Sequence, residues 1–430
     1  MISISFLKEQ MKENKFVKTE FVLLLSLMAF LFIPGINQLI VDRLISGLEN
    51  DVLNIAGQIE WFDLIDETLL AFLIVPLYFL FNEVAGDKNL LKTRINQTFI
   101  IGFCLYSLVS VFVYFYAHSL AAYMSAPIES ITYLQMETAG FVIGFISSFM
   151  YVVFVVRGNW KYIISLMIAR VVMLSIGYLI LIPEYGVIGL ATTNILCNFI
   201  LSIVSFLLLY KDGLFQLMPI FEKKSVYDWI RVGSFSGLQI FLDNIIYALI
   251  VVRMVNEVSS AGIYWLANNF IWGWLLIPVI ALAEIVKRDY LRGYKRIYNY
   301  LIVIGIILIL WLFSVPLWSV MFKTVIHAQE PVAILNVLYI LVPFYIAYSI
   351  AVVFDSVLIS VGKTKYLFAI SAIVNIIYYG IVYFLFLAGW FVGSLYFIIF
   401  MFGGGMIVHL LFSIVFFLHS KEKVKKLGWI

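Results

Sequence analysis

Apolar runs long enough to cross a lipid bilayer follow one another along almost the whole chain. A helix needs about 20 apolar residues to cross about 30 Å of hydrocarbon, and twelve runs are long enough to be candidates. These runs lie at roughly 21–46, 60–82, 97–117, 131–156, 162–183, 187–210, 229–252, 262–286, 297–321, 332–358, 365–389 and 393–419. In lipid, every backbone polar group must be bonded internally, so each run is expected to form a helix. The sequence therefore predicts an all-α polytopic membrane protein with twelve transmembrane helices.

The distribution of lysine and arginine predicts how these helices are oriented. Most of these residues fall in alternate loops and near the two ends of the chain. Cytoplasmic loops carry an excess of positive charge, so the basic loops and both termini are expected in the cytoplasm. The predicted location is the plasma (cytoplasmic) membrane, which is the inner membrane where a cell has two. The net charge of +3 then reflects topology and does not indicate a nucleic-acid partner.

An internal repeat predicts how the twelve helices are grouped. The stretches RGNWKYIISL (157–166) and VGKTKYLFAI (361–370) share Gly, Lys and Tyr at a common offset, which GVIG (186–189) and WFVG (390–393) keep. Six spans per repeat is an even number, so both halves enter the membrane in the same direction, as parallel repeats do. Two pseudo-symmetric six-helix lobes around a central cleft are the plan of an alternating-access transporter. The predicted lobes are residues 1–215 and 216–430.

Four short stretches resemble motifs of one transporter family. The first span carries LIVDRLISGL (39–48) and the seventh carries FLDNIIYALIV (241–251). The tenth carries VVFDSVLISVGKTKY (352–366), and NIIYYG (375–380) follows in the eleventh. In this order and spacing, the chain resembles a MATE (multidrug and toxic compound extrusion) exporter of the MOP flippase superfamily, nearest to the NorM-type branch but divergent from it. The resemblance extends over nearly the whole chain.

The resemblance implies cation-binding roles for three aspartates. Asp42 corresponds to the acid of the N-terminal lobe, while Asp243 and Asp355 correspond to the pair that binds the coupling cation. Both members of that pair also lie deep in their spans. Asp243 is about 18 Å from the inner edge and about 15 Å from the outer edge, and Asp355 is about 12 Å from the cytoplasmic edge. Carboxylate oxygens suit Na⁺ or H⁺, and binding either ion neutralises a charge that is costly in lipid. The alternative for Asp243 and Asp355 is a carboxyl that stays protonated and hydrogen-bonded in the core. The alternative for Asp42 is an interfacial pair with the neighbouring Arg43, with both side chains reaching toward water.

The fifth span departs from the family pattern. The proton-coupled branch has Asn followed four residues later by Asp, and these positions are held by Arg170 and Leu174 here. The proton site of the N-terminal lobe is therefore not intact. A guanidinium cannot lose its charge, so Arg170 in the middle of a span needs a carboxylate partner. Asp42 is the leading candidate, which predicts an Arg170–Asp42 charge pair.

Four carboxylates stand together in QIEWFDLIDETLLAF (58–72), at the start of the second predicted span. Glu60, Asp63 and Glu67 share one face of a helix at spacings of i, i+3 and i+7, with Asp66 beside them. They are expected in the outer two turns of the span, where water can reach them. One interpretation is a solvated helix end, where polar tips reach water. The other is a negatively charged vestibule facing a substrate cleft.

Aromatic and amide side chains recur at helical spacing in the eighth span. They are Trp265, Asn268, Asn269 and Trp272. This group could line a substrate cleft, although aromatic residues in membrane helices also pack against neighbours or lipid.

These observations together predict a cation-coupled antiporter, driven by Na⁺ or H⁺, that exports small organic and in particular cationic compounds by alternating access. A lipid-linked saccharide flippase of the same superfamily is the alternative. Its cargo carries phosphate, which favours a basic cavity, and Arg170 is the only strong candidate for one. The predicted partners are small organic substrates and membrane lipids, and the expected state is a monomer.

A membrane-embedded enzyme is a third interpretation, from a different class of protein. It would need a cluster of histidine, aspartate or metal ligands at a membrane face. The histidines are scattered and have no metal-ligand spacing. They are His118, His327, His409 and His419. The sequence also holds no nucleotide-binding loop and no nucleophile elbow. We therefore expect no enzyme, no metal site and no cofactor other than the coupling ion.

Overall fold

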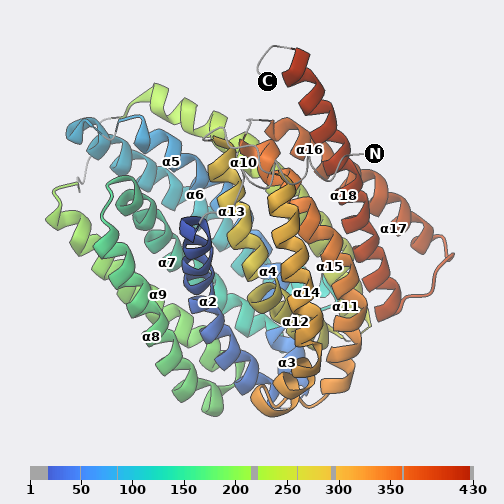
Figure 1. Ribbon diagram of the computed structural model, residues 1–430. Coiled ribbons are helices and arrows are strands. Elements are labelled where there is room, and N and C mark those ends of the chain that lie inside the picture. Colours follow the sequence, from blue (N-terminus) through green and yellow to red (C-terminus); the bar gives the residue numbers. More distant parts are fainter. Residues whose placement is uncertain are drawn as a thin grey trace. The chain divides into compact units, whose positions relative to one another are not determined.

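The computed structural model describes residues 18–48, 50–84, 86–214, 221–258, 260–291, 297–360 and 363–426. Within these ranges every regular element is a helix, and the elements follow one another along the chain as Figure 1 labels them. Four of them are short π-helical segments, in which an extra residue loosens the turn. Such segments are rare and often lie at functional sites.

The spans agree with the predicted ones. Eleven helical segments of the described residues are long and apolar enough to cross a membrane. The helices Ala261–Leu275 and Ile277–Tyr290 bend by 48° at their junction and make a twelfth span if they are counted as one. Each of the twelve overlaps one predicted run. The chain is thus an all-α, multi-pass membrane protein, as predicted.

The second span begins earlier than predicted. It covers Val52–Asn82 and contains α3 (Asn50–Ala56), α4 (Ile59–Leu73) and α5 (Val75–Asn82). Because α3 is only 7 residues long and a turn follows it, the sequence pattern gave no signal for it. The four carboxylates of 58–72 therefore lie well inside the span and not in its outer two turns, which corrects the predicted depth.

The chain forms two compact units whose limits fall inside helices. Unit 2 comprises Leu39–Trp265, and unit 1 comprises Met1–Gln38 and Leu266–Ile430. One limit lies in α2 (Lys18–Ser46) and the other in α12 (Ala261–Phe270). The division into lobes 1–215 and 216–430 concerns the parts that move in a transport cycle, and it stays a prediction.

Unit 2 is built around α7, which packs on α9 and α6, and around the pairing of α10 with α4. Its further elements are α6 (Lys88–Tyr123), α7 (Ser130–Val156), α8 (Trp160–Tyr185), α9 (Val187–Lys211), α10 (Lys223–Ile246), η1 (Tyr247–Val252) and α11 (Arg253–Glu257). Gly233 and Gly237 of α10 lie against Phe72 of α4, where a Cβ atom would overlap its neighbour. Small residues at this contact let the two helices approach closely.

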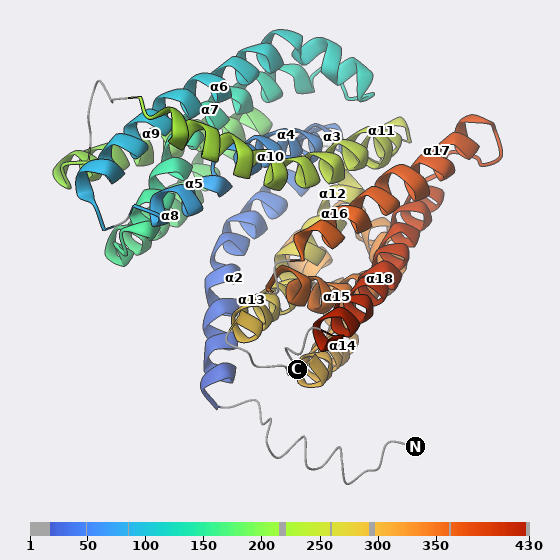
Figure 2. The same cartoon turned by 90° about the horizontal axis from the view of Figure 1, so that it is seen from above.

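Unit 1 is centred on α15 and α18, which lie side by side (Figure 2). Its elements after α12 are η2 (Ile271–Leu275), α13 (Ile277–Leu291), α14 (Ile297–Val320), η3 (Met321–Val325), α15 (Pro331–Ser360), α16 (Thr364–Ala372), η4 (Ile373–Tyr379), α17 (Gly380–Leu387) and α18 (Leu395–Lys426). The pairing of α15 with α18 brings Asp355 together with two polar side chains of α18, as described below.

Just beyond the second span, an ion-pair cluster ties the end of α5 to the first turns of α6. Arg94 is buried, and its Nη1 lies 2.6 Å from Glu83 Oε2 while its Nε lies 3.3 Å from Glu222 Oε2. The hydrogen bond and the charge of Arg94 lower the pKa of Glu83 below its ordinary value of 4.5.

Candidate functional site

The carboxylates of α4 form the main polar feature of unit 2. We call Glu60, Asp63, Asp66 and Glu67 the α4 acids. Glu60 Oε1 accepts a hydrogen bond of 2.6 Å from the hydroxyl of Tyr247, which lies 3.1 Å from the Tyr264 hydroxyl. Tyr247 is the first residue of η1, so this π-helical segment supplies the donor. The hydrogen bond holds Glu60 toward α10 and η1.

Two more of the α4 acids are held by neutral donors. Glu67 Oε2 accepts a hydrogen bond of 3.1 Å from Asn244 Nδ2, which also lies 3.2 Å from Thr68 Oγ1. Asp66 accepts a hydrogen bond from the hydroxyl of Tyr106 on α6. A cavity of about 10 Å³ adjoins Asp66 and Tyr106, which is close to the space that one water molecule needs.

Asp63 differs from the other α4 acids. It is exposed and makes no hydrogen bond within the described part of the chain. Asp63 interacts electrostatically with the three other α4 acids and with Glu137 of α7, and all of these groups are acids. Asp63 thus lies beside several like charges, and this arrangement favours a cation in its vicinity.

Glu137 is a residue that sequence reasoning missed. It is buried in the N-terminal third of α7, with 1% of its surface exposed. Its Oε1 accepts a hydrogen bond of 2.9 Å from Asn194 Nδ2, and Asn194 Oδ1 accepts one of 2.7 Å from the Tyr178 hydroxyl. It is the single carboxylate of its predicted span, 131–156, and that isolation is the signal by which the sequence could have singled it out.

Arg170 and Asp42 both belong to unit 2 but differ in burial. Arg170 lies on α8 and is exposed, whereas Asp42 lies on α2 with 3% of its surface exposed. Arg170 is close enough to Asp66 and Tyr178 to interact with them electrostatically. Asp66 is therefore an α4 acid under the influence of a positive charge. The Arg170–Asp42 charge pair stays a prediction.

The two acids predicted to share a cation lie in different units. Asp243 is half-buried on α10 of unit 2. Asp355 lies on α15 of unit 1, where His409 Nε2 of α18 is 2.7 Å from its Oδ2, and the Ser413 hydroxyl donates to its Oδ1 at 2.7 Å. Sequence reasoning missed His409, because only the contact between α15 and α18 gives it meaning. The shared cation site stays a prediction.

Part of the predicted aromatic group is brought together in unit 1. Trp272 of η2 donates from Nε1 to the Tyr345 hydroxyl at 3.2 Å, and Tyr345 donates to Asn268 Oδ1 at 3.0 Å. Trp272 is 42% exposed, so one face of this group is open. Asn269 is half-buried in the same unit, and Trp265 is buried in unit 2. Whether these residues line a substrate cleft stays a prediction.

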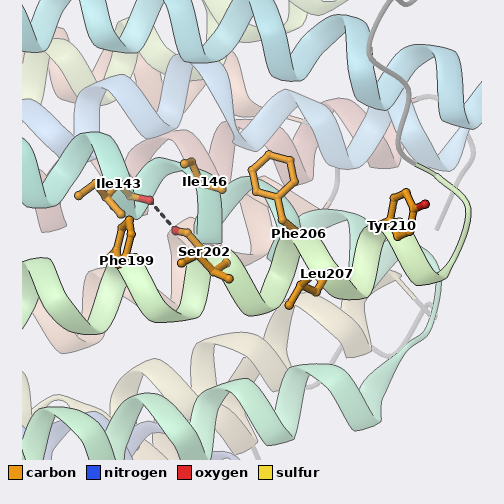
Figure 3. Close-up of a pocket in the computed structure, with 8 residues that line it drawn as sticks. Ile143, Ile146, Phe199, Ser202, Phe206, Leu207 and Tyr210 are labelled. Atoms are coloured by element: carbon orange, nitrogen blue, oxygen red, sulfur yellow. Dashed lines mark hydrogen bonds between the residues drawn. The ribbon is translucent and has the colours of Figure 1, made fainter.

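An apolar groove of about 490 Å³ lies on unit 2 between α7 and α9 (Figure 3). It is lined by Ile143, Ile146, Phe199, Ser202, Ile203, Phe206, Leu207 and Tyr210. Ser202 donates to the carbonyl of Ile143 at 2.9 Å, so its one hydroxyl is satisfied. The groove carries no charged side chain, and its exposed aromatic and aliphatic groups suit contact with lipid. It is separate from the α4 acids.

Comparisons with known proteins identify the fold. No family model matches the sequence, and no curated protein does. A solved structure described as the inward-facing conformation of a multidrug resistance MATE family transporter of the MOP superfamily is similar, with a TM-score of 0.74 and 16% identity. The similarity covers 95% of this chain and 98% of that one.

Two further solved structures support the same conclusion. One is a MOP superfamily transporter from Pyrococcus furiosus, with a TM-score of 0.68, 15% identity and coverage of 94% of this chain and 95% of that one. The other is a variant of the Vibrio cholerae MATE transporter VcmN, with a TM-score of 0.66, 17% identity and coverage of 94% and 97%. The chain therefore has the fold of MATE and MOP superfamily transporters.

Proposed function

We propose that this protein is a cation-coupled antiporter that exports small organic, in particular cationic, compounds by alternating access. The fold supports a transporter, since the solved structures with this fold are described as transporters. The single observation that carries the cationic preference is the row of α4 acids inside a membrane-spanning segment. Three of its members are held by neutral hydroxyl and amide donors, which satisfy hydrogen bonds without cancelling charge. The site therefore keeps a net negative charge for a cation to neutralise.

The alternative is a flippase for lipid-linked saccharides. Its phosphate-bearing cargo would be attracted by a basic site, because guanidinium groups bind phosphate in two-pronged hydrogen bonds. Near the α4 acids of unit 2, the exposed Arg170 supplies one positive charge, which acts on Asp66, against the four α4 acids and Glu137. The Pyrococcus furiosus transporter with this fold is described as having a binding pocket of reverse polarity that suggests a different function. Pocket charge is therefore the property that separates the two functions, and here it favours cationic cargo.

Several finer features belong to this proposal. Asp243, Asp355 and Asp42 bind the coupling ion, Na⁺ or H⁺, and no chemical reaction is part of the cycle. The protein lies in the cytoplasmic membrane with both termini inside, in contact with lipid, and works as a monomer.

The test is transport of a fluorescent cationic dye in proteoliposomes, with a Na⁺ gradient and a pH gradient imposed separately. We expect dye transport against its gradient with at least one of the two ions, and no transport after that gradient is dissipated by an ionophore. Dye movement that needs neither gradient, or movement of a phosphate-bearing lipid in place of the dye, would contradict the proposal.

A further inference from the structure

Glu137 and Tyr133 make an unusual pair on α7, one helical turn apart and therefore on the same face. Both side chains are buried, with 1% and 0% of their surfaces exposed. Glu137 uses only Oε1 in a hydrogen bond to a described residue, so Oε2 has no such bond. The Tyr133 hydroxyl has no hydrogen-bond partner within the described residues. A buried hydroxyl without a partner is costly, which suggests that it has one in another state of the site.

The groups that face Glu137 come from three neighbouring helices. Asp63 of α4 and Tyr178 of α8 are the titratable ones, and Asn194 of α9 is the neutral one. Tyr106 of α6 is bonded to Asp66 and not to Glu137. No described lysine, arginine or histidine makes an ion pair with Glu137 within the described residues. Two carboxylates that interact without a cation between them repel each other when both are ionised, which favours a proton on one of them.

We propose that Glu137 is a proton-binding site of the transport cycle and that Asp63 connects it to water. The proton leaves the Glu137 carboxyl from Oε2 and is taken up by the carboxylate of Asp63. Asp63, which is exposed, then passes the proton to water. Glu137 gains the negative charge that Asp63 loses in the first step, so the charge of the pair changes only when the proton reaches water.

Tyr133 is a positioning residue in this exchange. When Glu137 is ionised, the Tyr133 hydroxyl donates to Oε2 while Asn194 donates to Oε1, so both oxygens of the buried carboxylate are satisfied. The otherwise unpartnered hydroxyl thus gains a partner in the deprotonated state. This inference rests on the proposed function, since it names H⁺ as a coupling ion and places it in unit 2.

The test uses purified full-length protein in proteoliposomes and measures dye transport driven by a pH gradient. The Glu137→Gln variant can still accept from Asn194 through its amide oxygen but cannot release a proton. We expect it to lose at least tenfold in pH-driven transport while its melting temperature and dye binding stay close to wild type. Glu129→Gln, on an exposed residue just before α7, is the matched control and should transport normally.

Tyr133→Phe separates an effect on the proton from a structural effect. Without the donor to the ionised carboxylate, proton release needs a higher pH, so the midpoint of the pH profile should move upward. The melting temperature should not fall, because the hydroxyl that is removed has no partner in this structure. A lower melting temperature with an unchanged pH midpoint would assign Tyr133 a structural role only and would overturn its part in the inference.

The outcomes distinguish this inference from the proposed function. If wild type transports dye with neither a pH nor a Na⁺ gradient, the proposed function fails. If wild type is driven by a pH gradient and Glu137→Gln matches it, the proton site fails while the function stands. If only a Na⁺ gradient drives wild type, the function again stands and the proton site is wrong. Asp63→Asn, which removes the exposed acceptor, should slow pH-driven transport and gives a second variant if Glu137→Gln does not fold.

Discussion

The two units hold their intramembrane carboxylates in opposite ways. In unit 1, Asp355 lies 2.7 Å from His409, a side chain that can carry a positive charge of its own. In unit 2, Glu60, Asp66, Glu67 and Glu137 are bonded to tyrosine and asparagine side chains, which donate hydrogen bonds but bring no charge. A carboxylate beside a histidine can be neutralised from within the protein. A carboxylate beside neutral donors needs a proton or an external cation, and this difference assigns cation attraction to unit 2.

The largest effect is expected from Asp355→Asn. The amide can still accept from Ser413, but it can neither pair with a protonated His409 nor release a cation. We expect cation-driven efflux to fall more than tenfold in proteoliposomes. Glu284→Gln, on a 52% exposed side chain of the same unit, is the control and should be neutral. Normal efflux by Asp355→Asn would remove the ionic role assigned to unit 1.

A double-mutant cycle on His409 and Asp355 measures the same contact as a free energy of unfolding. A hydrogen bond to a charged group contributes about 1.5–3 kcal/mol, and this pair is partly exposed, so a coupling of about 2 kcal/mol is expected. The cycle compares His409→Gln, Asp355→Asn and the double variant in thermal unfolding. A coupling near zero would mean that His409 does not neutralise the charge of Asp355, which would then resemble the acids of unit 2.

A double-mutant cycle on Arg170 and Asp42 tests whether unit 2 also holds an intramembrane acid beside a positively charged side chain. Because Arg170 is exposed, an ion pair with Asp42 should contribute only about 1 kcal/mol. If thermal unfolding of Arg170→Met, Asp42→Asn and the double variant gives that coupling, the charge of Asp42 is compensated within the protein, unlike the charges of the α4 acids. If the coupling is absent, Arg170 acts on Asp66 instead, and Arg170→Met should alter dye affinity and leave stability unchanged.

The twelve spans could be predicted from the sequence because a long apolar run is a local signal. The start of the second span could not, since α3 is short and a turn at Gly57 and Gln58 separates it from α4. The α4 acids were also visible, because four carboxylates in an apolar chain stand out.

The partners of these acids could not be predicted. His409 lies 54 residues from Asp355 in the chain, and Asn194 lies 57 residues from Glu137. Each contact depends on which faces two helices turn toward each other, and a single sequence contains no signal for that. The roles of Asp42, Asp243 and Asp355 rest on the resemblance and stay predictions.

The smallest effect is expected at Glu83 of the Arg94 cluster, which lies just beyond the second membrane-spanning segment. The pKa of Glu83 is lowered in the folded protein, so its contribution to stability is fully present above the ordinary value of 4.5. That contribution is lost as the pH falls through the lowered pKa. We expect Glu83→Gln to decrease the melting temperature slightly at pH 7 and not at strongly acidic pH, as measured by thermal unfolding. An equal decrease at both pH values would show that charge is not involved.

The most direct test of the central claim compares a cationic and a neutral dye of similar size in the triple variant Glu60→Gln/Asp63→Asn/Glu67→Gln. The amides can keep the hydrogen bonds to Tyr247 and Asn244 while the charges are removed. We predict weaker apparent affinity for the cationic dye and little change for the neutral one. The difference should shrink at high ionic strength, because about 0.1 M salt screens charges over about 10 Å. An equal loss of apparent affinity for both dyes would contradict the assignment of cation attraction to the α4 acids. A difference in affinity that does not change with ionic strength would contradict it as well.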